Sequence, residues 1–382
     1  MDLFVLDTEF NRLAIIDTYE SLVWSERYYQ CGDFELYTPV TSDILANVKQ
    51  DYYLVRKDSD VVMIVETIQT STDVEDGNYL TITGRSLESI IDRRIVWGQK
   101  TISGNLQNGI KTLLNENIIS PSIANRKISN FVFEESTDPI VTALTIDAQY
   151  TGDNLYDVIS GICMDKKIGF RVKLNDSNQF VFSLYSGVDR SYEQTDNPYV
   201  IFSPKYDNLM NTKYIESHKA LKNVTLVGGD GEGPDRKYYS VGSVSGLERR
   251  ELFTDARDIS STDEEGETIP TNDYNALLEQ RGKEKLGENV NITTFEGEVE
   301  VGRTYQFGVD YNLGDVVEVE NEYGISAAPR IIEIVECQDE SGYSMVPTFD
   351  MDNIDITGPD ADAVFLTTAQ KKVLATATGG YS

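Results

Sequence analysis

The chain has 382 residues, of which 40% are hydrophobic and 25% charged, so it has enough apolar material for two to four folded domains and is not disordered as a whole. It carries 33 Lys and Arg against 64 Asp and Glu, a net charge of −31 that repels nucleic acid phosphates and excludes sequence-specific DNA binding. Its apolar runs are too short for an integral membrane segment, and Met1 is not followed by the basic region of a secretory signal, so we expect assembly in a cytosol.

Residues 1–97 are predicted to form a first small β-barrel. Short runs rich in β-branched and aromatic residues alternate with turn residues, and Asp76, Gly77 and Asn78 give a strong hairpin signal. Ser86 is a suitable N-cap for a short helix that follows, and Arg93 and Arg94 lie at its end, where the helix dipole favours cations.

Residues 98–204 are predicted to form an α+β insert. Apolar residues recur at helical spacing in 106–114 and again in 155–163, after Asn105 and Asp153. Gly169 is predicted to stop the second of these helices, and a hairpin is predicted around residues 175–178.

Residues 205–254 and 290–357 return to the strand pattern and are predicted to form a second, discontinuous barrel. An acidic loop and a helix starting near Asn272 interrupt it over residues 255–289. Residues 358–382 follow Gly358 and Pro359 as a weakly amphipathic tail. The predicted fold class is therefore mainly β with an α+β insert, built from two small β-barrel domains of which the second is interrupted.

The sequence offers few groups for catalysis, for a cofactor or for a metal. His218 is the single histidine and is not near a nucleophile motif, so a structural role is favoured. The glycine-rich run 228–233 lacks the Lys and Ser or Thr of a phosphate loop, and a wide hairpin loop with positive φ is favoured. Cys31, Cys163 and Cys337 are widely spaced and odd in number, which predicts reduced thiols.

Acidic and aromatic residues leave two alternatives open at each of three places. Asp310 and Asp315 could form a catalytic carboxylate pair, but their spacing around Gly314 favours side chains that cap backbone amides in a turn. The acids between Asp255 and Glu267 could chelate a divalent cation, although a solvated loop is favoured. Trp24 could be a sugar platform, although a place in a core or subunit interface is favoured.

Several segments, in their order along the chain, resemble the tail-tip hub proteins of long-tailed bacteriophages, a tail-associated family that is also similar to the central hub of contractile tails. The resemblance covers most of residues 3–357. The residues that carry it are Trp24, Gly32, Phe34, Leu36, Gly84, Arg94, Tyr206, Asn208, Tyr214, Arg249, Arg250, Glu251, Asp255, Asp310, Tyr311, Gly314, Asp315 and Val317.

This resemblance implies a structural protein with no catalytic residues, no cofactor and no metal. It implies a homotrimer whose paired barrels form a pseudo-sixfold ring at the virion tail tip, closing the tail tube and letting DNA pass. Its implied partners are the distal tail protein, the tail tube proteins and tail fibre or receptor-binding proteins, and a lytic domain would be a separate polypeptide. The alternatives are the hub of a contractile, phage-tail-like particle and a tail protein that binds or hydrolyses carbohydrate.

Overall fold

The computed structural model describes residues 1–57, 59–73, 77–263, 266–289, 292–299, 304–321 and 326–350. The N-terminal part is a β half with a buried aliphatic and aromatic core that includes Trp24 and Phe34. Its elements are β1 (Leu3–Leu6), β2 (Arg12–Ile16), β3 (Ser21–Arg27), β4 (Asp33–Pro39), α1 (Ser42–Asn47), β5 (Tyr53–Arg56), β6 (Val62–Asp73), β7 (Gly77–Ser86) and the 3-10 helix η1 (Leu87–Arg93).

The insert follows and packs its helices against short strands around the largest apolar core of the described residues. Its elements are β8 (Gln99–Asn105), α2 (Leu106–Leu114), η2 (Asn115–Ile119), η3 (Ala124–Arg126), β9 (Phe131–Glu134), α3 (Pro139–Ala143), β10 (Thr145–Thr151), α4 (Leu155–Lys166), β11 (Gly169–Leu174) and β12 (Phe180–Tyr185). The two helices predicted from apolar spacing are confirmed as α2 and α4, and the predicted hairpin is confirmed as the antiparallel pair β11 and β12.

The remaining strands form the C-terminal β half, which includes a small three-stranded sheet beside its part of the large sheet, and a second, separate three-stranded sheet. The elements are β13 (Ile201–Phe202), η4 (Pro204–Tyr206), β14 (Leu209–Ser217), β15 (Val224–Gly228), η5 (Gly233–Asp235), β16 (Tyr238–Val241), η6 (Gly246–Glu248), β17 (Glu251–Asp255), α5 (Thr271–Gly287), β18 (Ile292–Val299), β19 (Glu318–Glu320), β20 (Ser326–Ala327), β21 (Arg330–Asp339) and β22 (Gly342–Asp350).

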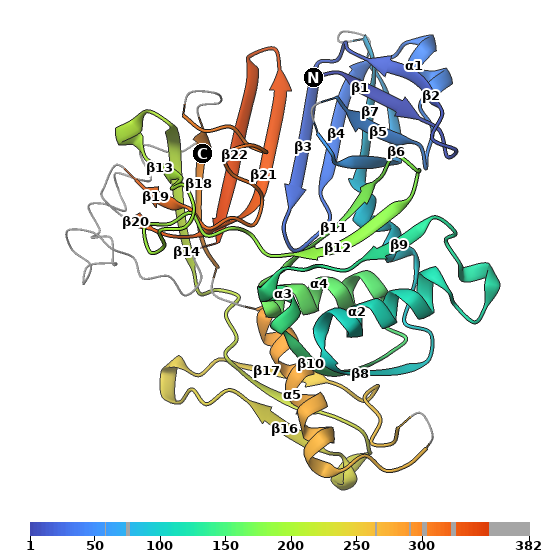
Figure 1. Ribbon diagram of the computed structural model, residues 1–382, viewed down its shortest axis with the longest axis vertical. Helices are drawn as coiled ribbons and strands as arrows, with labels where there is room; N and C mark the ends of the chain where they lie inside the picture. Colours follow the sequence, from blue (N-terminus) through green and yellow to red (C-terminus); the bar gives the residue numbers. More distant parts are fainter. Residues whose placement is uncertain are drawn as a thin grey trace.

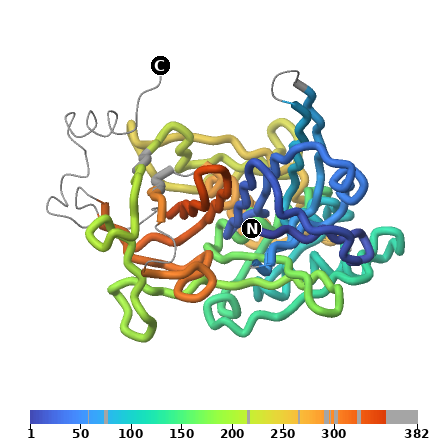
Figure 2. The backbone as a smooth tube through the Cα atoms, turned by 90° about the horizontal axis from the view of Figure 1, so that it is seen from above, coloured from blue at the N-terminus to red at the C-terminus, as the bar shows by residue number. Residues whose placement is uncertain are grey.

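One large sheet joins the two β halves. Its eleven strands run in the order β14-β18-β22-β21-β3-β4-β7-β6-β5-β1-β2, and β3 pairs antiparallel with β21 across the junction. Figure 1 shows β21 and β22 beside β3 and β4, with the insert helices below them, and Figure 2 shows the two halves side by side from above. The mainly β class with an α+β insert is confirmed, but the strands of the described residues form open sheets rather than closed barrels.

The strands near residues 224–241 differ from the sequence expectation. Instead of extending the second β half, β15 pairs with β16 and β17 in a three-stranded sheet whose inner face packs on α5. This module has its own core, formed by residues such as Val227, Tyr274 and Leu278, and it lies at the bottom of Figure 1. The domain limits given above remain a prediction.

Two local expectations are corrected by the backbone. Helix α4 ends at Lys166, and Lys167 takes the left-handed conformation there, so the expectation that Gly169 stops this helix is wrong. Gly169 instead begins β11, where a Cβ atom would lie 2.4 Å from the Tyr28 ring. Ser86 precedes a 3-10 helix without capping it, because its Oγ accepts a hydrogen bond from the Gly32 amide. In the hairpin predicted around Asp76, Gly77 and Asn78, the first residue, Asp76, lies outside the described residues.

Gly84 is required by the close approach of two strands. It pairs with Phe34 on β4 and faces a bulge in β6 between Val65 and Thr67. A Cβ atom at this position would lie 1.8 Å from the Ile64 carbonyl oxygen, so the bulged strand leaves no room for a side chain.

We expect Gly84→Ala to destabilise the protein by about 3 kcal/mol or more, at or above the upper end of overpacking costs, because backbone must move to admit the methyl group. The matched control is Gly161→Ala in α4, where a Cβ would meet nothing within 4 Å. Urea unfolding at a fixed protein concentration measures both, and similar midpoints for the two variants would contradict this account of Gly84.

Candidate functional site

The junction between the two β halves contains a buried ion pair. Arg56 on β5 bonds both carboxylate oxygens of Glu336 on β21, one of them through Nη2 at 3.1 Å. Both side chains are about 95% buried, and the Tyr343 hydroxyl donates a further hydrogen bond to Glu336. Removing one member of such a pair costs more than the pair contributes, because it leaves an uncompensated charge in the interior.

A second carboxylate, Glu26 on β3, lies beside this pair. Burial is the main factor that raises the pKa of Glu26 to about 7, and repulsion from Glu336 adds to it, while Arg56 and a 3.3 Å hydrogen bond from the Ser59 hydroxyl oppose the rise. The junction therefore places the carboxyl groups of Glu26 and Glu336 near the Arg56 guanidinium. Glu88, whose own pKa is raised by burial, lines the same cleft and also adds to the repulsion that acts on Glu26.

These residues line a cleft of about 1150 Å³ where the three parts of the chain meet. Its wall includes Glu26 and Arg56 from the first β half, Phe170 from the insert, and Tyr311 and Glu336 from the second half. The described part of the chain contains no cluster of three or more His, Cys, Asp or Glu side chains placed to hold a metal ion.

The predicted turn role of Asp310 and Asp315 is confirmed by their hydrogen bonds. Asp310 accepts from the Gln306 amide at 2.7 Å, and Asp315 accepts from the Asn312 amide at 3.0 Å. Asp315 is also the acceptor for the Val188 amide at 2.7 Å and for Arg190 at 2.8 Å, and it is 2% exposed. Its carboxylate thus fastens the end of the insert to the second β half.

Gly314 and Tyr311 complete this turn. Gly314 has a φ of 93°, and a Cβ there would lie 2.3 Å from the Tyr28 ring at the end of β3. Tyr311 is buried, and its hydroxyl lies 3.4 Å from the Met345 sulfur on β22. Residues 310–315 therefore pack against β3 and β22 at the junction between the two β halves.

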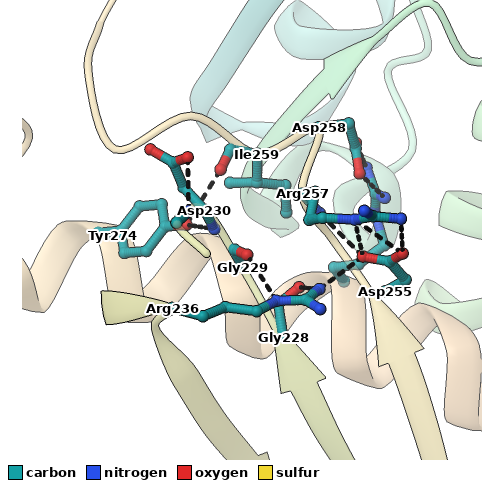
Figure 3. A network of polar contacts seen from close by, with 11 residues as sticks. Gly228, Gly229, Asp230, Arg236, Asp255, Arg257, Asp258, Ile259 and Tyr274 are labelled. Carbon is teal, nitrogen blue, oxygen red and sulfur yellow. Dashed lines mark hydrogen bonds and ion pairs between the residues drawn. The ribbon is translucent and has the colours of Figure 1, made fainter. Parts of the chain in front are cut away.

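A second polar network joins the module of β15 to β17 with α5, as Figure 3 shows. Asp255 binds Arg236 at 2.6 Å and Arg257 at 2.6 Å, and the Arg257 hydrogen bonds are the main reason that the pKa of Asp255 falls to about 2. Arg236 also donates to the carbonyls of Gly228 and Gly229 at 2.8 and 3.1 Å, which holds the glycine-rich loop in place.

The glycine-rich loop has the hairpin role expected from its composition. It connects β15 to β16, with positive φ at Gly231 and Gly233. The Asp230 amide donates to the Tyr274 hydroxyl at 2.7 Å, and that hydroxyl donates to the Ile259 carbonyl at 3.0 Å (Figure 3). The loop amides are thus held by protein groups rather than gathered around a site for phosphate.

The other candidate residues lie in structural positions. Trp24 is fully buried with its ring centroid 6.1 Å from that of Phe34, so the sugar-platform alternative is wrong. His218 is exposed, and its carbonyl accepts a hydrogen bond from Arg250. In the acidic loop, Asp263 accepts from the Glu267 amide at 2.8 Å, while Glu264 and Glu265 lie outside the described residues.

The residues that carried the resemblance fall into separate groups rather than one pocket. Arg94 donates to the Arg126 carbonyl at 2.8 Å, and Arg249 pairs with Glu251 at 2.5 Å beside β17. The Arg250 amide donates to the Asn223 side chain at 2.8 Å. Sequence reasoning missed Arg56, Glu336 and Glu26, because the residues that meet there are up to 310 positions apart and no local pattern connects them.

Comparisons with known proteins agree with this architecture. A family described as "Siphovirus ReqiPepy6 Gp37-like protein" matches residues 2–349. The chain is similar to the 43 kDa tail protein of prophage MuSo2 from Shewanella oneidensis (TM-score 0.55, 14% identity, 94% of this chain and 99% of that one). It is also similar to a tail protein from Neisseria meningitidis MC58 (TM-score 0.54, 13% identity, 92% and 96%).

A third similar structure is the prophage tail protein gp18 from Listeria monocytogenes EGD-e, with a TM-score of 0.50, 14% identity and coverage of 98% of this chain and 100% of that one. At these identities the likeness concerns the fold. No curated protein matches the sequence. Of the helices in the described ranges, none combines the length and apolar character that crossing a bilayer requires.

The raised pKa of Glu26 predicts a pH-dependent stability. The unfolded chain ionises this carboxyl freely near pH 4.5, whereas the folded chain holds the proton to about pH 7, so the free energy of unfolding falls as pH rises through this window. We expect Glu26→Gln to remove this contribution, with a gain over the parent that grows from pH 4.5 to 7 toward an upper bound of about 3 kcal/mol.

Urea unfolding of both proteins at several pH values measures this difference. Glu35→Gln, at an exposed position on the adjacent strand β4, is the matched control and should follow the parent curve at every pH. A constant difference between Glu26→Gln and the parent across the window would show that the folded protein ionises Glu26 as easily as the unfolded chain does.

Proposed function

Because this chain belongs to the Siphovirus ReqiPepy6 Gp37-like protein family, we propose that it is a structural hub at the tip of a phage tail. The family match over residues 2–349 is the observation that carries the proposal, and the fold shared with prophage tail proteins supports it. In this role three copies form a ring that closes the tail tube and joins it to the distal tail protein and to fibre or receptor-binding proteins.

The geometry of the large sheet suits a ring of pseudo-sixfold symmetry. Each copy contributes two β halves, which the pairing of β3 with β21 holds side by side as one unit. Three copies then present six β halves to a sixfold tube. With a net charge of −31 per chain, the wall of such a ring repels DNA phosphates, so that DNA passes without binding.

We further propose that the chain acts without catalysis, at the virion tail tip. Asp310 and Asp315, the candidate carboxylate pair, accept hydrogen bonds from backbone amides of their own turn. Asp315 is also buried and forms an ion pair with Arg190. The alternative of a carbohydrate-active tail protein has no geometric support at Trp24, which lies inside the first β half. A contractile, phage-tail-like particle remains an alternative setting for the same hub.

Light scattering of the purified chain should give the mass of three copies of the 42.8-kDa chain at tens of micromolar, a range in which weak oligomers form by mass action. Electron microscopy of the same sample should show a threefold ring with a central hole. A mass of one chain throughout this range, with no rings visible, would contradict the proposal.

A further inference from the structure

Three exposed tyrosines gather on the surface of the second β half. Tyr192 and Tyr206 are each 56% exposed and Tyr199 is 41% exposed, and the ring centroids of Tyr192 and Tyr199 are 5.3 Å apart in an edge-to-face arrangement. Tyr206 lies near enough to Tyr192 to raise the pKa of its phenol, after the larger effect of burial. We call Tyr192, Tyr199 and Tyr206 the tyrosine surface.

The backbone under the tyrosine surface is held by the sheet. The Tyr192 amide donates to the Glu318 carboxylate on β19 at 2.8 Å, and the Glu318 amide donates to the Val200 carbonyl at 2.9 Å. Tyr206 ends η4, where the Ser203 side chain caps the turn. The rings are therefore presented by fixed backbone, which lowers the entropy lost when a partner binds them.

The segment that carries Tyr192 also brings carboxylates together: Asp189 accepts from the Ser191 amide at 2.9 Å, Glu318 accepts from the Tyr192 amide at 2.8 Å, and Glu193 is the next residue along the chain. Burial, followed by repulsion from Glu193 and Asp189, raises the pKa of Glu318. Glu320 is paired with Lys205, but among the described residues no Lys or Arg forms an ion pair with Asp189, Glu193 or Glu318. A positive charge placed over the tyrosine surface would relieve this repulsion.

We propose that the tyrosine surface binds an extended basic segment of another protein. Arg or Lys side chains of that segment would stack on the faces of the exposed rings through cation–π contacts and pair with the carboxylates of Asp189 and Glu193. A neutral glycan would also stack on the rings, but it would leave the carboxylates unbalanced. Another copy of this chain, with its net charge of −31, would add to the repulsion.

The test uses the full chain and an amidated, fluorescently labelled hexapeptide that alternates Gly and Arg, with binding followed by anisotropy. We expect Tyr192→Ala/Tyr206→Ala to weaken binding by about tenfold, since two cation–π contacts are lost. The matched control is Tyr238→Ala, a 52% exposed tyrosine on β16 that should leave binding unchanged. Binding by the parent should weaken as salt rises, because the attraction involves exposed charges.

A second pair of variants separates a specific site from general attraction to an acidic protein. Asp189→Asn/Glu193→Gln and Glu9→Gln/Asp17→Asn remove the same charge from exposed positions, and only the first pair lies at the tyrosine surface. We expect the first pair to weaken binding several-fold more than the second, since a Debye length of about 10 Å at 0.1 M salt limits the reach of remote charges.

Equal weakening by the two charge pairs would overturn the proposal, because it would mean that the peptide responds only to net charge. Binding of a neutral oligosaccharide that the tyrosine variant abolishes would overturn it in favour of a glycan site. A trimer that dissociates in the tyrosine variant would overturn it in favour of a subunit contact. A monomeric parent that still binds the peptide at this surface would contradict the hub proposal and leave this inference standing.

Discussion

The arrangement of the whole molecule depends on the antiparallel pairing of β3 with β21. This ladder joins residues near position 25 to residues near position 335, and it runs from Arg27 opposite Glu333 to Leu22 opposite Gln338. The two β halves have separate apolar cores, so burial within each half does not fix their relative position. The β3–β21 ladder, together with the buried Arg56–Glu336 pair beside it, fixes the position of one half relative to the other.

The end of β3 also ties the insert to this junction, through Tyr28. Its ring is fully buried against Gly169 of the insert and Gly314 of the second half, and a Cβ at either glycine would lie within 2.4 Å of the ring. The Tyr28 hydroxyl donates to the Tyr185 carbonyl at 3.3 Å. The end of β3 therefore contacts all three parts of the chain. The Tyr28 ring fits between the insert and the second half only because Gly169 and Gly314 have no side chain.

Features that depend on nearby residues were predictable from the sequence, and features that depend on distant pairing were not. Apolar spacing predicted α2 and α4, and the spacing of Asp310 and Asp315 predicted turn caps, because each involves interactions within a few residues. Barrel closure could not be judged in this way. Closure depends on which edge strands pair with each other. Alternation of apolar and polar residues shows which face of a strand is buried, but it does not show which strand lies beside it.

The same limit explains the separate module and the missed junction residues. The strand pattern over 224–241 was detected, but nothing local shows that β15 pairs in parallel with β17 and packs on α5 rather than joining the main sheet. The preference of glycine for helix ends predicts that Gly169 stops α4, yet Lys167 takes that position and Gly169 makes room for the Tyr28 ring.

The net charge of −31 follows from composition alone, but its effect on binding depends on the charge of the partner. Salt screens the repulsion between identical copies, so it should favour the proposed trimer. It also weakens attraction between opposite charges, so it should disfavour the proposed binding of a basic segment at the tyrosine surface, and the two proposals therefore predict opposite responses to salt.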